Sequence, residues 1–266
     1  MGEFFWGHLR YILQPLEKIG ILEMGGVQVG AARSLARELA RGRDGSHDAA
    51  HSERVARLAV RLAREEQAGG RWGELAGGGA RDLEVVELCA LLHDVADHKY
   101  REGLQAREER LRGFLAGEAG LAGPEAAAVQ AAIDGLGFKE ELKATGGGGP
   151  GSSRPRHVSD LTAVVMDADR LDAIGAIGIA RCFTFGGARN RTLHDPAIPP
   201  RTELSREEYC SEEAQARQTT LNHFSEKLLK LKGLMRSEAG RRAAAQRHAF
   251  MEQYLEQFHA EWAGER

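Results

Sequence analysis

Long apolar runs and cysteine motifs are both missing from this sequence. No apolar stretch approaches the roughly 20 residues that span a bilayer, and Glu3, His8 and Arg10 interrupt the apolar N-terminus, which argues against a secretory signal. Only three cysteines are present, far apart and without a C-x-x-C spacing, so neither a disulfide framework nor a cysteine-based zinc site is expected. We therefore predict a cytoplasmic protein with no membrane partner.

An excess of charge of one sign is also missing. The formal net charge is −3 at pH 7, and the arginines and lysines are interleaved with glutamates and aspartates. A nucleic-acid-binding surface needs a basic stripe, which this pattern does not supply, so no nucleic-acid partner is expected. An anionic small-molecule substrate would have to be neutralised by local basic residues.

Strand patterns are the third absence. Short β-branched stretches such as Val164-Val165 lie inside longer segments with a helical period, and no alternating run is flanked by hairpin residues. Apolar residues recur at three- and four-residue spacings instead, which predicts an all-α fold. The clearest apolar faces consist of Val55, Leu58, Ala59 and Leu62, of Leu221, Phe224, Leu228 and Leu231, and of Phe250, Tyr254, Phe258 and Trp262.

Glycine- and proline-rich segments divide this helical pattern. Residues 68–80 and 145–153 are expected to form flexible loops, and residues 185–200 separate the central helices from a C-terminal helical pair at about 205–262. The pair is charged on one face and apolar on the other. We therefore expect it to pack on the same core and not to form a separate domain.

His93 and Asp94 end an apolar run, residues 85–92, that contains a single charge. An imidazole beside a carboxylate in a low-dielectric environment is costly unless hydrogen bonds or a cation compensate it, and a divalent metal would do so. The pair His194-Asp195 follows no such run and precedes a proline, so it is expected to form a turn.

Two further segments can complete a metal site. A helix over residues 44–62 would direct His51 inward, although a single inward histidine is more often a core residue with a backbone partner. Residues 164–174 add three aspartates to an otherwise apolar helix. Two imidazoles and two carboxylates would leave two positions of an octahedron for water or phosphate oxygen. Such a mixed set suits Mn²⁺, Fe²⁺, Ni²⁺ or Co²⁺, and Mg²⁺ less well.

The ordered set His51, His93-Asp94 and Asp169 resembles the H…HD…D signature of the HD-domain metal-dependent phosphohydrolases. The longer segments 47–51, 167–181 and 222–232 resemble the YedJ/YpgQ-like branch of that superfamily. The resemblance implies an HD-domain helical bundle in which the C-terminal pair packs on the same core. Its expected extent is residues 41–266, with the core motifs within 44–191, after an N-terminal extension at 1–40 whose role the sequence does not indicate.

The resemblance also implies the metal ligands, which are His51, His93, Asp94 and one aspartate of the third motif. Asp169 is preferred because Ala-Asp-Arg-Leu is the local pattern of that motif. Asp167 lies about 200° away around a helix, so both cannot easily bind one ion. Asp167 and Asp172 are then expected to orient the ligands or to pack helices.

Asp97 takes the position at which many HD enzymes have a catalytic acid. On a helix that ends near Tyr100, it would lie on the same side as His93 and Asp94. Its alternative role is a solvated helix-end acid paired with Lys99 or Arg101. Candidate phosphate-binding cations are Lys99, Lys139 and Arg181, with His47 as a hydrogen-bond donor, although each is equally compatible with a solvated surface position.

The function implied is metal-dependent hydrolysis of a nucleotide, most simply of a (deoxy)nucleoside triphosphate to monophosphate and pyrophosphate, with Mn²⁺ as the preferred ion. A nucleotidase or phosphodiesterase would use the same site. A non-catalytic metal-binding regulatory or scaffold module, which dimerises or binds a partner through its C-terminal helices, is the alternative from another class. The sequence is also compatible with an enzyme that is a homodimer.

Overall fold

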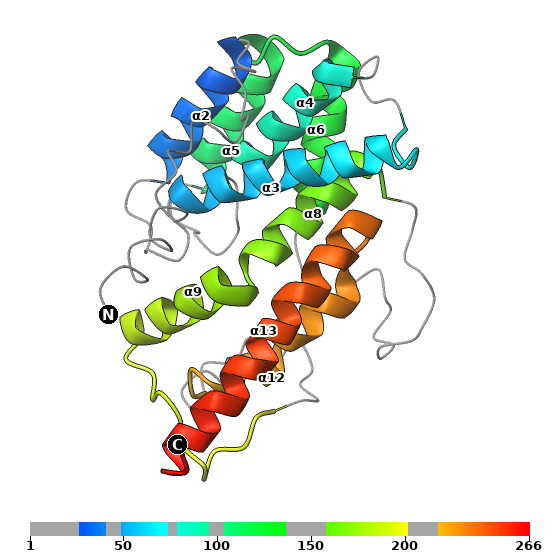
Figure 1. Cartoon of the computed structure of the whole chain (residues 1–266). Helices are drawn as coiled ribbons and strands as arrows, with labels where there is room; N and C mark the ends of the chain where they lie inside the picture. The colour runs from blue at the N-terminus through cyan, green and yellow to red at the C-terminus, as the bar shows by residue number, and fades with distance from the viewer. Residues whose placement is uncertain (1–26, 41–48, 74–78, 96–103, 137–157, 202–217) are drawn as a thin grey trace, which may run out of the picture.

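The computed structural model describes residues 27–40, 49–73, 79–95, 104–136, 158–201 and 218–266 (Figure 1). Within these ranges the chain is helical and has no β-strand, which confirms the all-α prediction. The elements are α2 (Val27–Leu39), α3 (Ala49–Ala68), α4 (Gly79–Leu92), α5 (Leu104–Gly113) with a π-helical continuation (Phe114–Glu118), α6 (Gly123–Gly135), α8 (Asp160–Asp172), α9 (Gly175–Ala188), α12 (Asn222–Glu226), the 3₁₀ helix η3 (Leu228–Leu234) and α13 (Glu238–Trp262).

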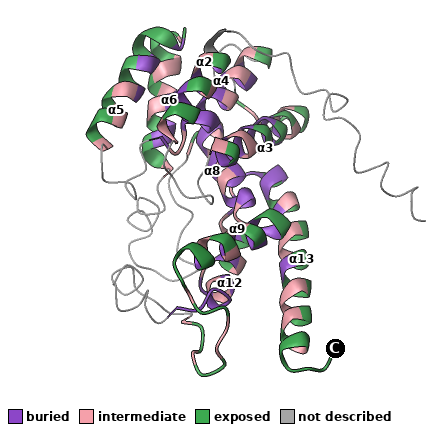
Figure 2. Ribbon diagram, turned by 90° about the vertical axis from the view of Figure 1, so that its left-hand side faces the viewer, coloured by how far each residue is buried: buried purple, intermediate pink, exposed green. Residues whose placement is uncertain are grey.

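Helix α3 packs on both α4 and α8, and these three helices enclose the centre of the core (Figure 2). Of the predicted apolar face of α3, Val55, Ala59 and Leu62 are fully buried, and Leu58 is partly buried against the same core. Burial of each Val or Leu side chain stabilises the fold by about 1.5–3 kcal/mol. The close-packed apolar core therefore fixes the positions of the polar side chains that α3, α4 and α8 direct toward one another.

Helix α2 covers α4 and extends the same core. Its residues Val29, Ala32 and Leu35 are buried in the main hydrophobic cluster. Residues 27–39 of the predicted N-terminal extension thus form a core helix, whereas residues 1–26 lie outside the described part of the chain.

The C-terminal helices pack on the core formed by the other helices, which confirms the predicted arrangement. Helix α13 contacts α3, α8 and α9, and Met251 belongs to the main hydrophobic cluster. Phe224 and Leu228 also face this cluster, but the segment around them is not one helix. Lys227 has φ −138° and ψ −57°, which ends α12, and the chain continues as the 3₁₀ helix η3.

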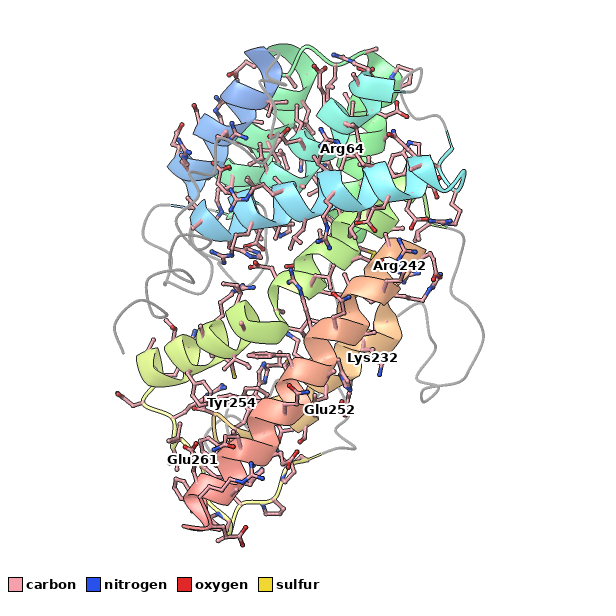
Figure 3. All side chains as sticks on the ribbon, in the orientation of Figure 1. Arg64, Lys232, Arg242, Glu252, Tyr254 and Glu261 are labelled. Atoms are coloured by element: carbon pink, nitrogen blue, oxygen red, sulfur yellow. The ribbon has the colours of Figure 1, made fainter. Side chains whose placement is uncertain are left out.

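The distal half of α13 is amphipathic. Its Tyr254 ring lies 6.1 Å from the ring of Phe183 on α9, while Glu252 and Glu261 are exposed (Figure 3). Phe250 and Trp262 remain 48% and 50% exposed, so the predicted apolar face is only partly covered.

The connections follow the predicted breaks where they are described. Helix α3 ends at Ala68 and α4 begins at Gly79, within the expected loop at 68–80. The predicted turn after His194 is confirmed, because the backbone N–H of Ala197 donates to the Asp195 carboxylate at 2.9 Å.

Among the described helices, none alone is long and apolar enough to cross a membrane. Helices α8 and α9 meet that test only as a pair, with a bend of 64° between them.

Candidate metal centre

His51 lies in the first turn of α3 and is 2% exposed. Its Nδ1 is 2.8 Å from Oδ2 of Asp172. An ionised carboxylate can only accept a hydrogen bond, so Nδ1 carries the proton and donates it. The lone pair is consequently on Nε2, which lies 3.5 Å from Oδ1 of Asp169.

His93 lies immediately after α4. The expectation of a helix that continues to near Tyr100 is wrong for residues 93–95, because α4 ends at Leu92 and a turn follows. Nδ1 of His93 donates to the carbonyl oxygen of Ala90 at 2.8 Å, which satisfies one of the acceptors left over in the last helical turn. The Nε2 lone pair of His93 therefore also faces Asp169, with 3.8 Å between Nε2 and Oδ1.

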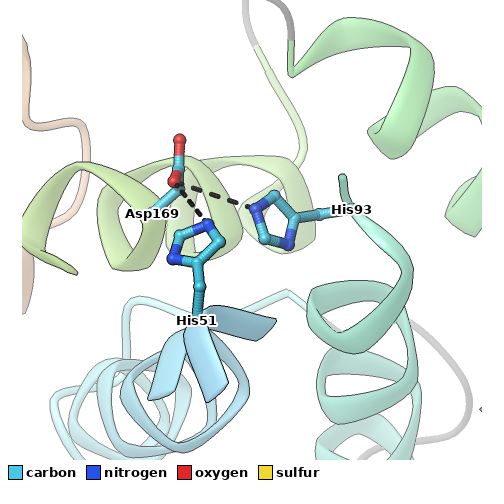
Figure 4. Close-up of side chains that lie close together, drawn as sticks. All are labelled: His51, His93 and Asp169. Carbon is cyan, nitrogen blue, oxygen red and sulfur yellow. Dashed lines mark ion pairs between the residues drawn. The ribbon is translucent and has the colours of Figure 1, made fainter. Parts of the chain in front are cut away.

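The three side chains meet from three different helical segments (Figure 4). Their candidate ligand atoms all lie within 4.8 Å of one another, and the two imidazole rings are 5.2 Å apart at an interplanar angle of 68°. The histidines are buried, with side-chain exposures of 2% and 5%, whereas the Asp169 side chain is 46% exposed. The cluster is thus rigid on its imidazole side and open to solvent on its carboxylate side.

The two histidines have pKa shifts of opposite sign. Burial is the largest influence on His51 and, with the positive charges of His93 and Arg181, lowers its pKa despite the hydrogen bond to Asp172 and the charge of Asp169. Burial also acts to lower the pKa of His93, but the hydrogen bond and charge of Asp169, with the charge of Asp94, raise it overall. The carboxylates therefore favour positive charge at the position that the two Nε2 atoms face.

Asp172, the last residue of α8, is the most heavily bonded carboxylate near the cluster. Arg54 donates from Nε to Oδ1 at 2.7 Å and from Nη2 to Oδ2 at 3.0 Å, and Arg181 donates from Nη1 to Oδ2 at 2.9 Å. Burial would raise the pKa of Asp172, but the hydrogen bonds from His51 and Arg54 and the nearby positive charges bring it to about 2. Arg181, predicted to bind phosphate, is thus placed beside Asp172.

Asp167 faces the opposite side of α8. It is completely buried and accepts hydrogen bonds from the backbone of Arg236 and from the backbone and hydroxyl of Ser237, at the start of α13. Helical geometry predicts that Asp167 and Asp169 are about 200° apart. The two carboxylates accordingly contact different parts of the protein. Asp167 joins helices, and Asp169 faces the histidines.

The structure brings together three of the four predicted metal ligands. Asp94 follows His93 and its charge acts on that residue, but its carboxylate is not among the ligand atoms that lie within 4.8 Å of one another. Its assignment as a ligand stays a prediction. The predicted catalytic acid Asp97 and the predicted substrate contacts His47, Lys99 and Lys139 lie outside the described residues.

The donor set fits a divalent metal. Two imidazoles present Nε2 lone pairs to one carboxylate, and a hydrogen bond at each Nδ1 fixes the ring, as is usual for metal-bound histidines. Nitrogen and oxygen donors in this combination suit borderline divalent ions. His51, His93 and Asp169 could hold such an ion.

The chain belongs to the HD-domain superfamily of hydrolases. The HD domain family matches residues 48–174, which include all four predicted ligands, and HD domains bind divalent metals. Within the superfamily the chain is similar to the uncharacterised protein YpgQ of Bacillus subtilis, with 30% identity over 218 residues, 82% of this chain and 85% of YpgQ.

Solved structures support the same relationship. A protein from Lactobacillus plantarum has 32% identity and a TM-score of 0.68, covering 91% of this chain and 99% of its own. The crystal structure of B. subtilis YpgQ in complex with ADP has 29% identity and a TM-score of 0.62, covering 88% and 97%. An HD-superfamily hydrolase from Bacillus thuringiensis has 32% identity and a TM-score of 0.59, covering 89% and 97%.

Proposed function

We propose that this protein is a metal-dependent phosphohydrolase that cleaves (deoxy)nucleoside triphosphates to monophosphates and pyrophosphate. The observation that carries the proposal is the convergence of His51, His93 and Asp169 at a position open to solvent. The ADP bound to the relative YpgQ supports a nucleotide as the ligand. Mn²⁺ is the ion of this proposal, and a donor set that mixes imidazole nitrogen with carboxylate oxygen suits it as it suits Fe²⁺, Co²⁺ or Ni²⁺.

In the proposed mechanism, separate residues would hold the metal, act on the attacking water and bind the phosphates. When bound, a divalent ion would supply polarisation of a phosphoryl oxygen and a lowered pKa of a coordinated water. His51, His93, Asp94 and Asp169 would hold that ion, and Asp97 would orient the attacking water or take its proton. Phosphoryl transfer then depends mainly on neutralising charge. In this proposal the phosphates are contacted by His47, Lys99, Lys139 and Arg181.

A nucleotide panel tests the proposal. Purified protein would be incubated with each dNTP and NTP in the presence of Mn²⁺, Mg²⁺, Co²⁺ or Ni²⁺, and the phosphorus products would be separated. We expect pyrophosphate and monophosphate from wild type and none from Asp169→Ala. The matched control is Asp134→Ala, which removes an exposed aspartate of α6 and should retain full activity.

Each contrary outcome removes a different part of the proposal. Undiminished hydrolysis by Asp169→Ala would refute the site. Orthophosphate as the sole phosphorus product from dNTPs would refute pyrophosphate release. Because ADP is a diphosphate, its presence in YpgQ is equally compatible with a nucleotidase or phosphodiesterase that uses the same cluster. Metal binding without turnover of any nucleotide would instead support the regulatory or scaffold module.

A further inference from the structure

The Nδ1 atoms of the two imidazoles in the cluster donate hydrogen bonds to different kinds of acceptor. Nδ1 of His93 donates to a neutral backbone carbonyl, that of Ala90. Nδ1 of His51 donates to the carboxylate of Asp172, whose side chain is 2% exposed. A carboxylate acceptor makes the opposite ring nitrogen a stronger electron donor than a carbonyl does, so the two histidines are not equivalent as ligands.

Asp172 is itself fixed by two arginines. Arg54 donates to both carboxylate oxygens of Asp172 as a bidentate pair, and Arg181 of α9 donates to Oδ2. With the bond from His51, Oδ2 accepts three hydrogen bonds and Oδ1 accepts one. Bidentate Arg–carboxylate pairs fix orientation as well as energy, so the carboxylate has little freedom to rotate away from His51.

We propose that Asp172, clamped by Arg54 and Arg181, is a positioning residue that fixes the Nδ1–H tautomer of His51 and thereby sets the metal affinity of the site. The inference rests on the proposed function, since it takes the cluster of His51, His93 and Asp169 to be a metal site. Asp172 does not contact the ion. It acts through His51, and the arginines act through Asp172.

A purely structural role is the competing explanation, because Asp172 also connects α8 to α3 and α9. Asp167 provides the matched control. Both residues are buried aspartates of α8 that accept several hydrogen bonds, but the partners of Asp167 lie at the start of α13. Loss of either carboxylate should destabilise the fold, whereas only loss of Asp172 should affect His51.

The experiment compares Asp172→Ala with Asp167→Ala in the full chain. Mn²⁺ affinity is measured by titration calorimetry without nucleotide, unfolding is measured with urea, and the imidazole ¹⁵N shifts of His51 are recorded on metal-free protein. We expect Asp172→Ala, which removes the acceptor of the His51 proton, to bind Mn²⁺ about 10–100-fold more weakly and to lose the Nδ1–H signature of His51. Asp167→Ala should retain both properties while its unfolding midpoint falls.

Two results would overturn the inference. One is an unchanged tautomer and metal affinity in folded Asp172→Ala, and the other is an equal loss of metal affinity in Asp167→Ala. If Asp172→Ala does not fold, Arg181→Gln replaces it and should show a smaller loss of metal affinity, and an unchanged affinity in that variant would overturn the inference. The tautomer is read without metal or nucleotide, so the inference can fail or hold independently of whether wild type hydrolyses a nucleotide.

Discussion

In the part of the chain that the structure describes, the two histidines between α3, α4 and α8 and the histidine of α12 lie in two regions with different surroundings. Between α3, α4 and α8, both His51 and His93 donate through Nδ1 to an acceptor and present Nε2 to Asp169. In α12, Nδ1 of His223 is buried and has no hydrogen-bond partner in the part of the chain that the structure describes. Burial of a histidine therefore does not by itself indicate a metal site. The acceptor behind the ring and the carboxylate in front of it do.

Electrostatics separate the two regions in the same way. The carboxylates around His93 raise its pKa against the effect of burial. Among the described residues, the causes resolved at His223 are burial and then the charges of Lys227 and Arg191, which lower its pKa to about 3. The surroundings of His93 therefore favour a positive charge, and those of His223 disfavour it.

The largest expected effect comes from removing an imidazole of the cluster. His93→Ala should lower kcat/KM for the best nucleotide by on the order of 1,000-fold, the equivalent of about 4 kcal/mol of lost transition-state stabilisation. His223→Ala should leave kcat/KM within about threefold of wild type, because it removes a buried ring outside the proposed site. Steady-state kinetics of both variants at matched folded fractions measure the difference. Comparable losses in the two would show that the regions do not differ in function.

A smaller effect is expected where α13 begins beside Asp167. A Cβ added at Gly240 would collide with the Asp167 carboxylate and with the hydroxyl of Ser237. Gly240→Ala should therefore lower the free energy of unfolding by about 1–3 kcal/mol, the usual cost of overpacking. Urea denaturation gives this value, and Mn²⁺ titration should show an unchanged dissociation constant. A weakened metal site would mean that the two faces of α8 are coupled.

The smallest effect is a pH dependence of stability that His223 contributes. Above about pH 6.5 the ring is neutral in both the folded and the unfolded state, so it contributes no dependence. As the pH falls below that value, the unfolded state binds a proton that the folded state does not bind until about pH 3. The free energy of unfolding therefore falls with pH. The slope from this residue is small near pH 7 and approaches about 1.4 kcal/mol per pH unit well below pH 6.5. Urea unfolding of wild type and His223→Gln between pH 7 and 5 should show a shallower dependence in the variant, and equal slopes would contradict it.

The candidate ligands could be predicted from the resemblance to the HD-domain signature, and helical spacing predicts how two of them are oriented. The spacing of His51 with Val55 and Leu58 places its ring on the inner side of α3, and the 100° step per residue separates Asp169 from Asp167. The all-α class followed from the same periodicity.

Other features could not be predicted because they depend on how a helix ends or on contacts between distant segments. The turn at residues 93–95 carries a hydrogen bond from the His93 side chain back to Ala90 in the last turn of α4, which no spacing rule records. The pairing of Arg181 with Asp172 depends on the bend between α8 and α9. The predicted roles of Asp97, His47, Lys99 and Lys139 fall on residues outside the described ranges and stay predictions.

The hydrogen bond from His93 to Ala90 couples one ligand of the candidate metal site to the last turn of α4. Helix termini fray more readily than helix interiors. Opening of the last turn of α4 would break this hydrogen bond and loosen the orientation of the His93 ring, so we expect local unwinding to weaken the binding of an ion. An ion held by His93 would in turn slow amide hydrogen exchange in that turn.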